Sequence, residues 1–275
     1  MDAYRVAYDG TAFRGFQRQP HGETVEDTIF ITLKHLGVEF ADGKPIGYSA
    51  AGRTDAGVSA CAQTIGFVAP EWMTITKMNE MLPDTIWVWA HASVDSDFHA
   101  RFGAAARQYR YFLSDSDLNE TKASRACSRL SGKHDFHNLT PDTKHTVRTV
   151  EVAFNGDNTG TSIDCIAAGF PRQLVRRIVT VVCKIATGRR SMAFIDTILG
   201  DEPCTGSTGV SPAPAEQLLL LDVSYPNVVF QTDQAARMAT DEVFSKRMAE
   251  LQAQARVFAT LSTHCLDERD TTNLR

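Results

Sequence analysis

The sequence contains no hydrophobic run long enough to cross a membrane, for which about 18 consecutive apolar residues are needed. The first residues carry charge and hold no apolar signal segment. We therefore expect a cytoplasmic protein with no membrane anchor. The 6 cysteines, at positions 61, 127, 165, 183, 204 and 265, form no C-x-x-C pair. This spacing argues against a thiol metal or redox centre, and we expect reduced, mostly buried thiols.

Acidic residues are missing from two stretches of the chain, although its net charge is -5. No Asp or Glu lies between Asp164 and Asp196, or between Asp97 and Asp115. The basic residues in these stretches are Arg172, Arg176, Arg177, Lys184, Arg189 and Arg190 in the first, and Arg101, Arg107 and Arg110 in the second. An acidic protein can still carry a basic surface that binds phosphates. The alternative is that these residues only solvate a helix.

The pattern of apolar residues predicts an α+β protein. A chain of 275 residues, 43% of them hydrophobic, can bury a large core. Alternating apolar residues predict strands at 3–8, 46–51, 62–68, 85–92, 108–113, 147–154, 162–167 and 218–223. Helical spacing predicts helices at 24–37, 74–82 and 172–187, and one or two short helices within 121–137. This order is the ferredoxin-like βαββαβ pattern, present twice.

The repeated pattern divides the chain into a unit over residues 1–103, a second unit over 104–226, and a helical C-terminal extension over 227–275. We expect the two units to form one continuous, mainly antiparallel sheet with a central cleft, and the helices to pack on the other face. The loop around Asp55 and the strand around Tyr109 would then face the same cleft.

One carboxylate, Asp55, follows Arg53 by two positions in a loop bounded by Gly52 and Gly57. Glycines permit backbone torsions and a close approach that side chains would block. A carboxylate beside guanidinium groups favours its anionic form and can act as a nucleophile or a base. The arginine could hold a phosphate or replace an extruded base. The alternative is a surface turn with a local ion pair.

The strand predicted at 108–113 places Tyr109, Tyr111 and Arg107 on one face. Tyrosines at this spacing commonly pack in a sheet core. The functional alternative is that one of them stacks on a flat base such as uracil.

The helix predicted at 172–187 carries an apolar stripe, and Arg176 lies beside that stripe. The N-terminal end of this helix, near Arg172, can attract anions through unpaired backbone amides. A partly buried arginine needs a carboxylate partner, and Asp55 is the candidate. The alternative is that the Arg176 guanidinium reaches solvent.

Five segments occur in the order found in TruA-type tRNA pseudouridine synthases, and the chain resembles that family over residues 4–225. The segments are YDGTAFRGFQRQ at 8–19, GRTDAGVSA at 52–60, FHARFGAAARQYRY at 98–111, GFPRQLVRRIV at 169–179 and APAEQLLLLDVSY at 213–225. The extension after residue 226 lies outside this resemblance and suggests an archaeal or otherwise divergent member.

The resemblance implies an isomerase, without cofactor or metal, that converts uridine to pseudouridine at positions 38 to 40 of the tRNA anticodon stem-loop. It also implies a homodimer that binds tRNA across both subunits. Matched by position, Asp55 is the catalytic aspartate, Arg53 helps to displace the target base, Tyr109 stacks on the uracil, and Arg176 pairs with the carboxylate. We expect Arg53, Tyr109 and two further basic residues, Arg107 and Arg172, to bind the substrate. Whether Asp55 attacks the ribose C1′ or removes a proton from the sugar stays open.

A non-catalytic RNA-binding protein is the main alternative, because ferredoxin-like units resemble RRM folds. Such a protein would carry an RNP-like aromatic pattern, which the sequence lacks. An aspartyl enzyme for phosphorylated substrates would need a further carboxylate near Asp55 to bind a metal, and the neighbouring sequence has none.

Overall fold

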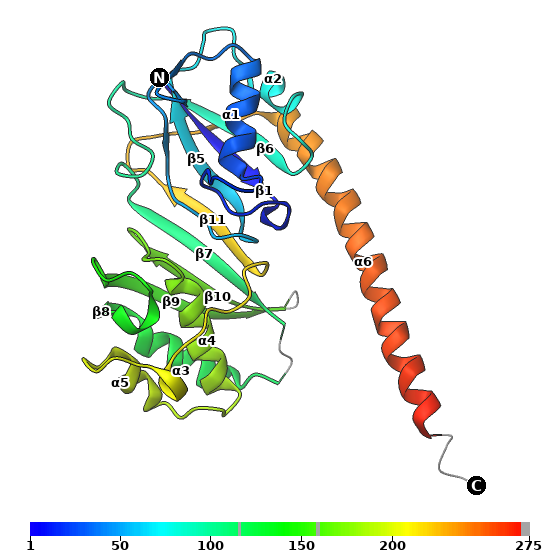
Figure 1. The fold of residues 1–275 in the computed structure, drawn as a ribbon. Helices are drawn as coiled ribbons and strands as arrows, with labels where there is room; N and C mark the ends of the chain where they lie inside the picture. The colour runs from blue at the N-terminus through cyan, green and yellow to red at the C-terminus, as the bar shows by residue number, and fades with distance from the viewer. Residues whose placement is uncertain (115–116, 158–159, 271–275) are drawn as a thin grey trace.

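A sheet of 10 strands runs through the whole body of the molecule in the computed structural model, which describes residues 1–114, 117–157 and 160–270 (Figure 1). Its strand order is β12-β6-β1-β5-β11-β7-β10-β9-β8, and β4 pairs with β5 beside this path. The strands are β1 Asp2–Tyr8, β4 Ser49–Ala50, β5 Ser59–Phe67, β6 Ile86–Ser93, β7 Ala106–Leu113, β8 Gly132–Asp135, β9 Val147–Asp157, β10 Gly160–Ala167, β11 Leu218–Ser224 and β12 Gln231–Thr232. A separate pair is formed by β2 Phe40–Ala41 and β3 Lys44–Pro45.

The strand order repeats in the two halves, which confirms the predicted double βαββαβ pattern. The first half has the order β6-β1-β5-β4, and the second has β11-β7-β10-β9. The helices are α1 Val25–His35, α2 Ile75–Asn79, α3 Glu120–Leu130, α4 Leu174–Ala186, α5 Phe194–Leu199 and α6 Gln234–Asp270, with short 3-10 turns η1 Gly10–Ala12, η2 His137–Leu139 and η3 Gly206–Thr208. The halves meet where β11 pairs in parallel with β5. The other described strand pairs are antiparallel.

Local capping explains where the first two helices begin. The side chain of Thr24 accepts a hydrogen bond from the backbone N–H of Asp27, and Thr74 accepts one from Lys77. Each threonine thereby satisfies a backbone donor that the first helical turn leaves without a partner.

Two local predictions differ from the structure. The one or two short helices expected within 121–137 are present as α3, but residues 132–135 form the edge strand β8, because they pair with β9 from Gly132 opposite Val150 to Asp135 opposite Val147. The strand predicted at 46–51 shortens to β4, Ser49–Ala50.

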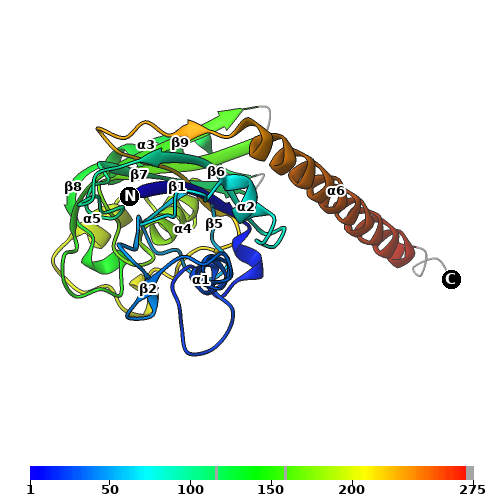
Figure 2. The ribbon, with the colours of Figure 1, turned by 90° about the horizontal axis from the view of Figure 1, so that it is seen from above.

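Helices α1 and α4 lie on the same face of the sheet as the candidate site, not on the opposite face as expected, whereas α6 contacts Trp87, which points to the other face. Residues paired across neighbouring strands point to one face, and Tyr8, Ala60, Leu220 and Tyr109 form such a row across four strands. Figure 2 shows α1 and α4 on one side of the sheet. Arg176 of α4 contacts Asp55, so this helix packs over the face that carries Tyr109.

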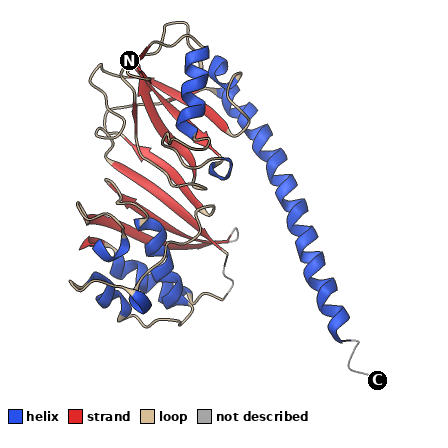
Figure 3. Ribbon diagram, in the orientation of Figure 1, coloured by secondary structure: helices blue, strands red, loops and turns tan. Residues whose placement is uncertain are grey.

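Helix α6 extends away from the body after a short contact with the edge of the sheet (Figure 3). Its residue Phe244 packs on Trp87 of β6, with the ring centroids 4.5 Å apart. Most of the helix beyond this contact is exposed up to residue 262. None of the described helices is both long enough and apolar enough to cross a membrane.

Candidate active site

The loop that carries Asp55, residues 51–58, connects β4 with β5 and is held by hydrogen bonds from the sheet. The side-chain amide of Gln63 on β5 donates to the Gly52 carbonyl at 2.8 Å and accepts from the Gly52 N–H at 3.2 Å. The hydroxyls of Tyr8 and Thr54 lie 2.8 Å apart. The Thr54 carbonyl also accepts from the N–H of Phe16 at 3.1 Å. These contacts fix the backbone on both sides of the catalytic candidate.

A glycine is required at the end of this loop. Gly57 has a φ of +86°, which L side chains rarely adopt, and a Cβ there would lie 3.2 Å from the Ala215 side chain. The loop can approach the segment around Ala215 this closely because residue 57 has no side chain.

Asp55 forms an ion pair with Arg176, and 121 residues separate the two in the sequence. The Arg176 Nη1 atom donates to the Asp55 Oδ2 atom at 2.8 Å. The carboxylate side chain is 33% exposed and the arginine side chain 15% exposed, so this carboxylate can still be reached by a ligand. The pairing predicted from the helix pattern is therefore present, and the alternative of an arginine that reaches solvent is wrong.

Arg176 is fixed from behind by the segment that precedes β11. Its Nε atom donates to the Ala213 carbonyl at 2.6 Å. In return, the Arg176 carbonyl accepts from the Ala213 N–H at 3.1 Å. The guanidinium can therefore present Nη1 to Asp55 in one orientation, which favours a preorganised charge pair.

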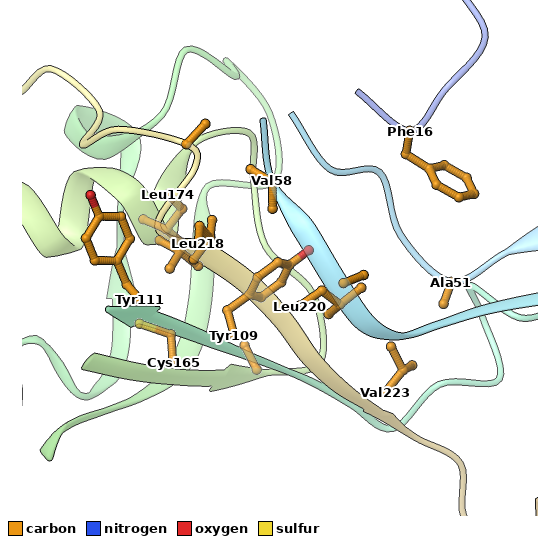
Figure 4. Packing of buried hydrophobic residues seen from close by; sticks show 14 of the residues in the cluster. Phe16, Ala51, Val58, Tyr109, Tyr111, Cys165, Leu174, Leu218, Leu220 and Val223 are labelled. Carbon is orange, nitrogen blue, oxygen red and sulfur yellow. The ribbon is translucent and has the colours of Figure 1, made fainter. Parts of the chain in front are cut away.

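Tyr109 lies on β7 beside this loop and is 8% exposed. Its hydroxyl would be 4.0 Å from a Cβ placed on Gly52, and its ring meets Phe170 edge-on at 5.3 Å between centroids. Figure 4 shows the Tyr109 ring near Val58 and Leu220. Burial raises the pKa of Tyr109 to about 12; Arg107 lowers it and Asp55 adds to the rise. The phenol therefore stays neutral at physiological pH.

The second tyrosine of this strand has a packing role. Tyr111 is 2% exposed and donates its hydroxyl to the Gln217 side chain at 2.7 Å. The predicted shared face of Tyr109, Tyr111 and Arg107 is confirmed, and all three side chains are buried.

Arg53 and Arg172, two of the predicted substrate-binding residues, are exposed. The backbone N–H of Arg172 donates to Asp142 at 2.8 Å, just before α4. Burial lowers the pKa of the neighbouring Arg177, and the charges of Arg176 and Arg172 lower it further. Positive charge is thus concentrated at the start of α4.

Arg107 has a different environment from the one expected for a substrate-binding residue. It is 7% exposed, and its guanidinium donates to three backbone carbonyls. These are Ala51 at 2.7 and 3.2 Å, Arg101 at 2.6 Å, and Ala168. With its donors directed at the backbone, Arg107 is placed to hold chain segments together. This geometry does not favour a direct contact between Arg107 and the substrate.

Sequence reasoning did not identify Gln63, Phe170 or the Ala213 carbonyl. Each acts through its position in the fold, since amide, aromatic and backbone groups occur everywhere in a sequence. Phe170 could have been noticed, because it lies within the GFPRQ segment before α4. Among the described residues, no group of three or more His, Cys, Asp and Glu side chains could hold a metal ion.

Comparison with known proteins gives the context for this geometry. A family model described as tRNA pseudouridine synthase matches residues 126–226. A protein of Natronomonas pharaonis named tRNA pseudouridine synthase A is 50% identical over 95% of this chain and 99% of its own length. Relatives with the same name in Haloarcula marismortui and Methanosarcina mazei are 45% and 38% identical, and each match covers at least 94% of this chain and 97% of the relative.

The chain belongs to the tRNA pseudouridine synthase family. The match to the Natronomonas pharaonis protein covers 95% of this chain's 275 residues, so the similarity continues beyond residue 226, and the expectation that it would end there is wrong. A solved Cbf5-Nop10-Gar1 complex is 13% identical, with a TM-score of 0.31, over 65% of this chain and 46% of that chain. A similarity that low carries no argument about the site.

Proposed function

We propose that this protein isomerises uridine to pseudouridine in tRNA, with Asp55 as its catalytic carboxylate. The observation that carries the proposal is the Asp55–Arg176 ion pair, with an Nη1 to Oδ2 distance of 2.8 Å, beside the buried ring of Tyr109. The names of the near full-length relatives support the substrate.

The reaction needs few groups. The bond between uracil N1 and ribose C1′ breaks, the uracil turns, and a bond forms between C5 and C1′. The C5 hydrogen then leaves as a proton, and N1 takes up a proton. Asp55 can start this sequence as a nucleophile at C1′ or as a base toward the sugar. Arg176 orients the carboxylate through the ion pair between its Nη1 atom and the Asp55 Oδ2 atom.

In this proposal, the other site residues position the target base. Tyr109 offers an apolar ring with a neutral hydroxyl, which suits stacking on uracil. Arg53 is exposed two residues before Asp55 and can occupy the space that an extruded base leaves. Arg172 contributes charge toward the phosphates. We infer that Arg107 holds the segments around Ala51, Arg101 and Ala168 in position through their backbone carbonyls.

We further propose that the target lies at positions 38 to 40 of the anticodon stem-loop, as the resemblance to TruA-type enzymes implies, and that the enzyme works in the cytoplasm. Residues 1–103 and 104–226 would act as two units, each contributing one half of the ion pair.

We also propose that the enzyme is a homodimer joined through α6. A spacing of four and three residues in alternation, typical of a coiled-coil seam, links Phe244, Met248, Leu251, Ala255 and Phe258. The first of them, Phe244, also contacts Trp87 of its own chain. Four of these side chains are large, and each is at least 43% exposed. Two such stripes packed together would bury on the order of 1,000 Å², the lower limit for a specific interface.

The charge of α6 favours a second copy of the chain over RNA as the partner. Between residues 234 and 262 the basic residues Arg237, Lys246, Arg247 and Arg256 nearly balance the acidic residues Asp241, Glu242 and Glu250. An RNA-binding helix needs a basic face, whereas two balanced helices can associate without repulsion.

Tritium release tests the proposed activity directly. Purified protein is incubated in EDTA with tRNA transcripts labelled with tritium at uridine C5, and the released tritium is counted. We expect release without added metal or nucleotide, and mapping of pseudouridine should place it at positions 38 to 40. Absence of release would contradict the activity, whereas release with modification elsewhere would contradict only the target position.

A further inference from the structure

One large aromatic side chain near the candidate site is exposed to solvent. Phe102, in the loop between β6 and β7, is 77% exposed. The ring of His99 lies beside it, with centroids 4.4 Å apart and planes at 43°. The guanidinium carbon of Arg101 lies 5.7 Å from the Phe102 ring centroid. An aromatic ring, an imidazole and a cation are thereby gathered on one short stretch of chain.

The loop cannot easily turn this ring inward, because its backbone is anchored on several sides. The Ala100 N–H donates to the Ser49 hydroxyl at 2.9 Å, and the Ala100 carbonyl accepts from the Tyr225 hydroxyl at 2.6 Å. The Gly103 N–H donates to the His99 carbonyl at 2.8 Å. An exposed ring on such an anchored loop is preorganised for a ligand, since little freedom is lost on binding.

The same loop is tied to the segment that leads to Asp55. The Nη2 atom of Arg107 donates both to the Arg101 carbonyl at 2.6 Å and to the Ala51 carbonyl at 2.7 Å. Ala51 precedes Asp55 by four residues. One buried guanidinium therefore sets the position of the exposed ring relative to the catalytic candidate.

We propose that Phe102, flanked by His99 and Arg101, is a stacking platform for an unpaired base of the tRNA outside the target uridine. This inference rests on the proposed function. Aromatic faces stack on any base, and Arg101 can contact the adjoining phosphate. The segment over residues 98–114 contains no acidic residue that would repel the RNA backbone. A single ring beside a guanidinium and an imidazole matches a nucleotide better than an apolar protein surface.

The experiment compares Phe102→Ala, Phe102→Trp and Phe112→Ala. Phe112 is the matched control, because it is 50% exposed and lies on β7 facing away from the row that contains Tyr109. For each protein, the equilibrium Kd for tRNA is measured at fixed salt by filter binding, and kcat and KM are measured by tritium release.

We expect Phe102→Ala to raise Kd and KM about tenfold, the loss typical of one base stack, and to leave kcat unchanged. Phe102→Trp should keep wild-type Kd, and Phe112→Ala should change neither constant. Wild-type Kd and KM in Phe102→Ala would overturn the platform, as would an equal effect in Phe112→Ala. The binding measurement needs no turnover, so an inactive wild-type protein would contradict the proposed function without deciding this result.

Discussion

The Nη1 atom of Arg176 and the Oδ2 atom of Asp55 lie 2.8 Å apart, although one belongs to α4 and the other to the loop before β5. Neither half of the sheet contains this pair alone. The ion pair lies across the junction at which β11 of the second half pairs with β5 of the first. The geometry of the site therefore depends on how the two halves pack against each other.

Reversing the charge of Arg176 should damage both stability and turnover. Arg176→Glu would place two carboxylates in contact, and we expect a loss of about 1–3 kcal/mol in the free energy of unfolding, limited by the partial exposure of Asp55. Turnover should fall at least 100-fold, an order-of-magnitude expectation for a lost preorganised charge. Urea unfolding and tritium release measure the two effects. Wild-type values in both assays would rule out the ion pair.

Arg107 offers a test between positioning and direct substrate contact. In Arg107→Met the carbonyls of Ala51, Ala168 and Arg101 lose their donor, and we expect kcat to fall while KM changes by less than about threefold. Added guanidinium ion should restore part of kcat. Arg172→Met is the matched control, and there we expect mainly a higher KM. A raised KM at unchanged kcat in Arg107→Met would favour direct contact with the tRNA.

Stability should fall at high pH because tyrosines are buried. Burial raises the pKa of Tyr109 to about 12 and that of Tyr225 to about 12, whereas an unfolded phenol titrates near about 10. These groups contribute fully to the free energy of unfolding below about pH 10. The contribution is lost as the pH rises toward about 12, because in this range only the unfolded chain releases the protons. For each proton that only the unfolded chain releases, the free energy of unfolding falls by about 1.4 kcal/mol per pH unit.

Tyr109→Phe should therefore lose stability less steeply than the wild type above about pH 10. Urea unfolding at several alkaline pH values measures the difference in slope. Parallel curves for the two proteins would show that Tyr109 does not titrate differently in the folded state.

The α6 seam predicts which substitutions dissociate the dimer. Leu251→Glu with Phe258→Glu places charges within the apolar stripe, and we expect a monomer by light scattering at micromolar concentration, with the fold intact by circular dichroism. Ala253→Glu lies on the opposite side of the helix, since it is two residues from the seam position Leu251, and should leave the dimer unchanged. A wild-type monomer, or a dimer in the double variant, would contradict the interface.

Local patterns in the sequence were enough to predict most strands and helices. Thr24 and Thr74 act as helix caps through neighbours three residues away, so short-range chemistry decides where those helices start. The edge strand β8 was not predicted, because Gly132–Asp135 becomes a strand only by pairing with β9. The face occupied by the helices also depends on how the halves pack.

The site residues show the same division. The charge pattern predicted the pairing of Arg176 with Asp55, because a buried arginine without a carboxylate is costly. The environment of Arg107 was not predictable, since its partners are backbone carbonyls brought together from three separate segments. No side-chain pattern in a sequence marks such a set of acceptors.

The most direct test of Asp55 as the catalytic carboxylate replaces it by asparagine, which keeps the shape of the side chain and removes its charge. Asp42→Asn, in the exposed turn between β2 and β3, is the matched control. We predict that Asp55→Asn releases no tritium from uridine-labelled tRNA while its Kd for tRNA stays within about threefold of the wild-type value, because phosphate contacts supply most of the affinity. Turnover at the wild-type rate in Asp55→Asn would contradict a catalytic role for this carboxylate.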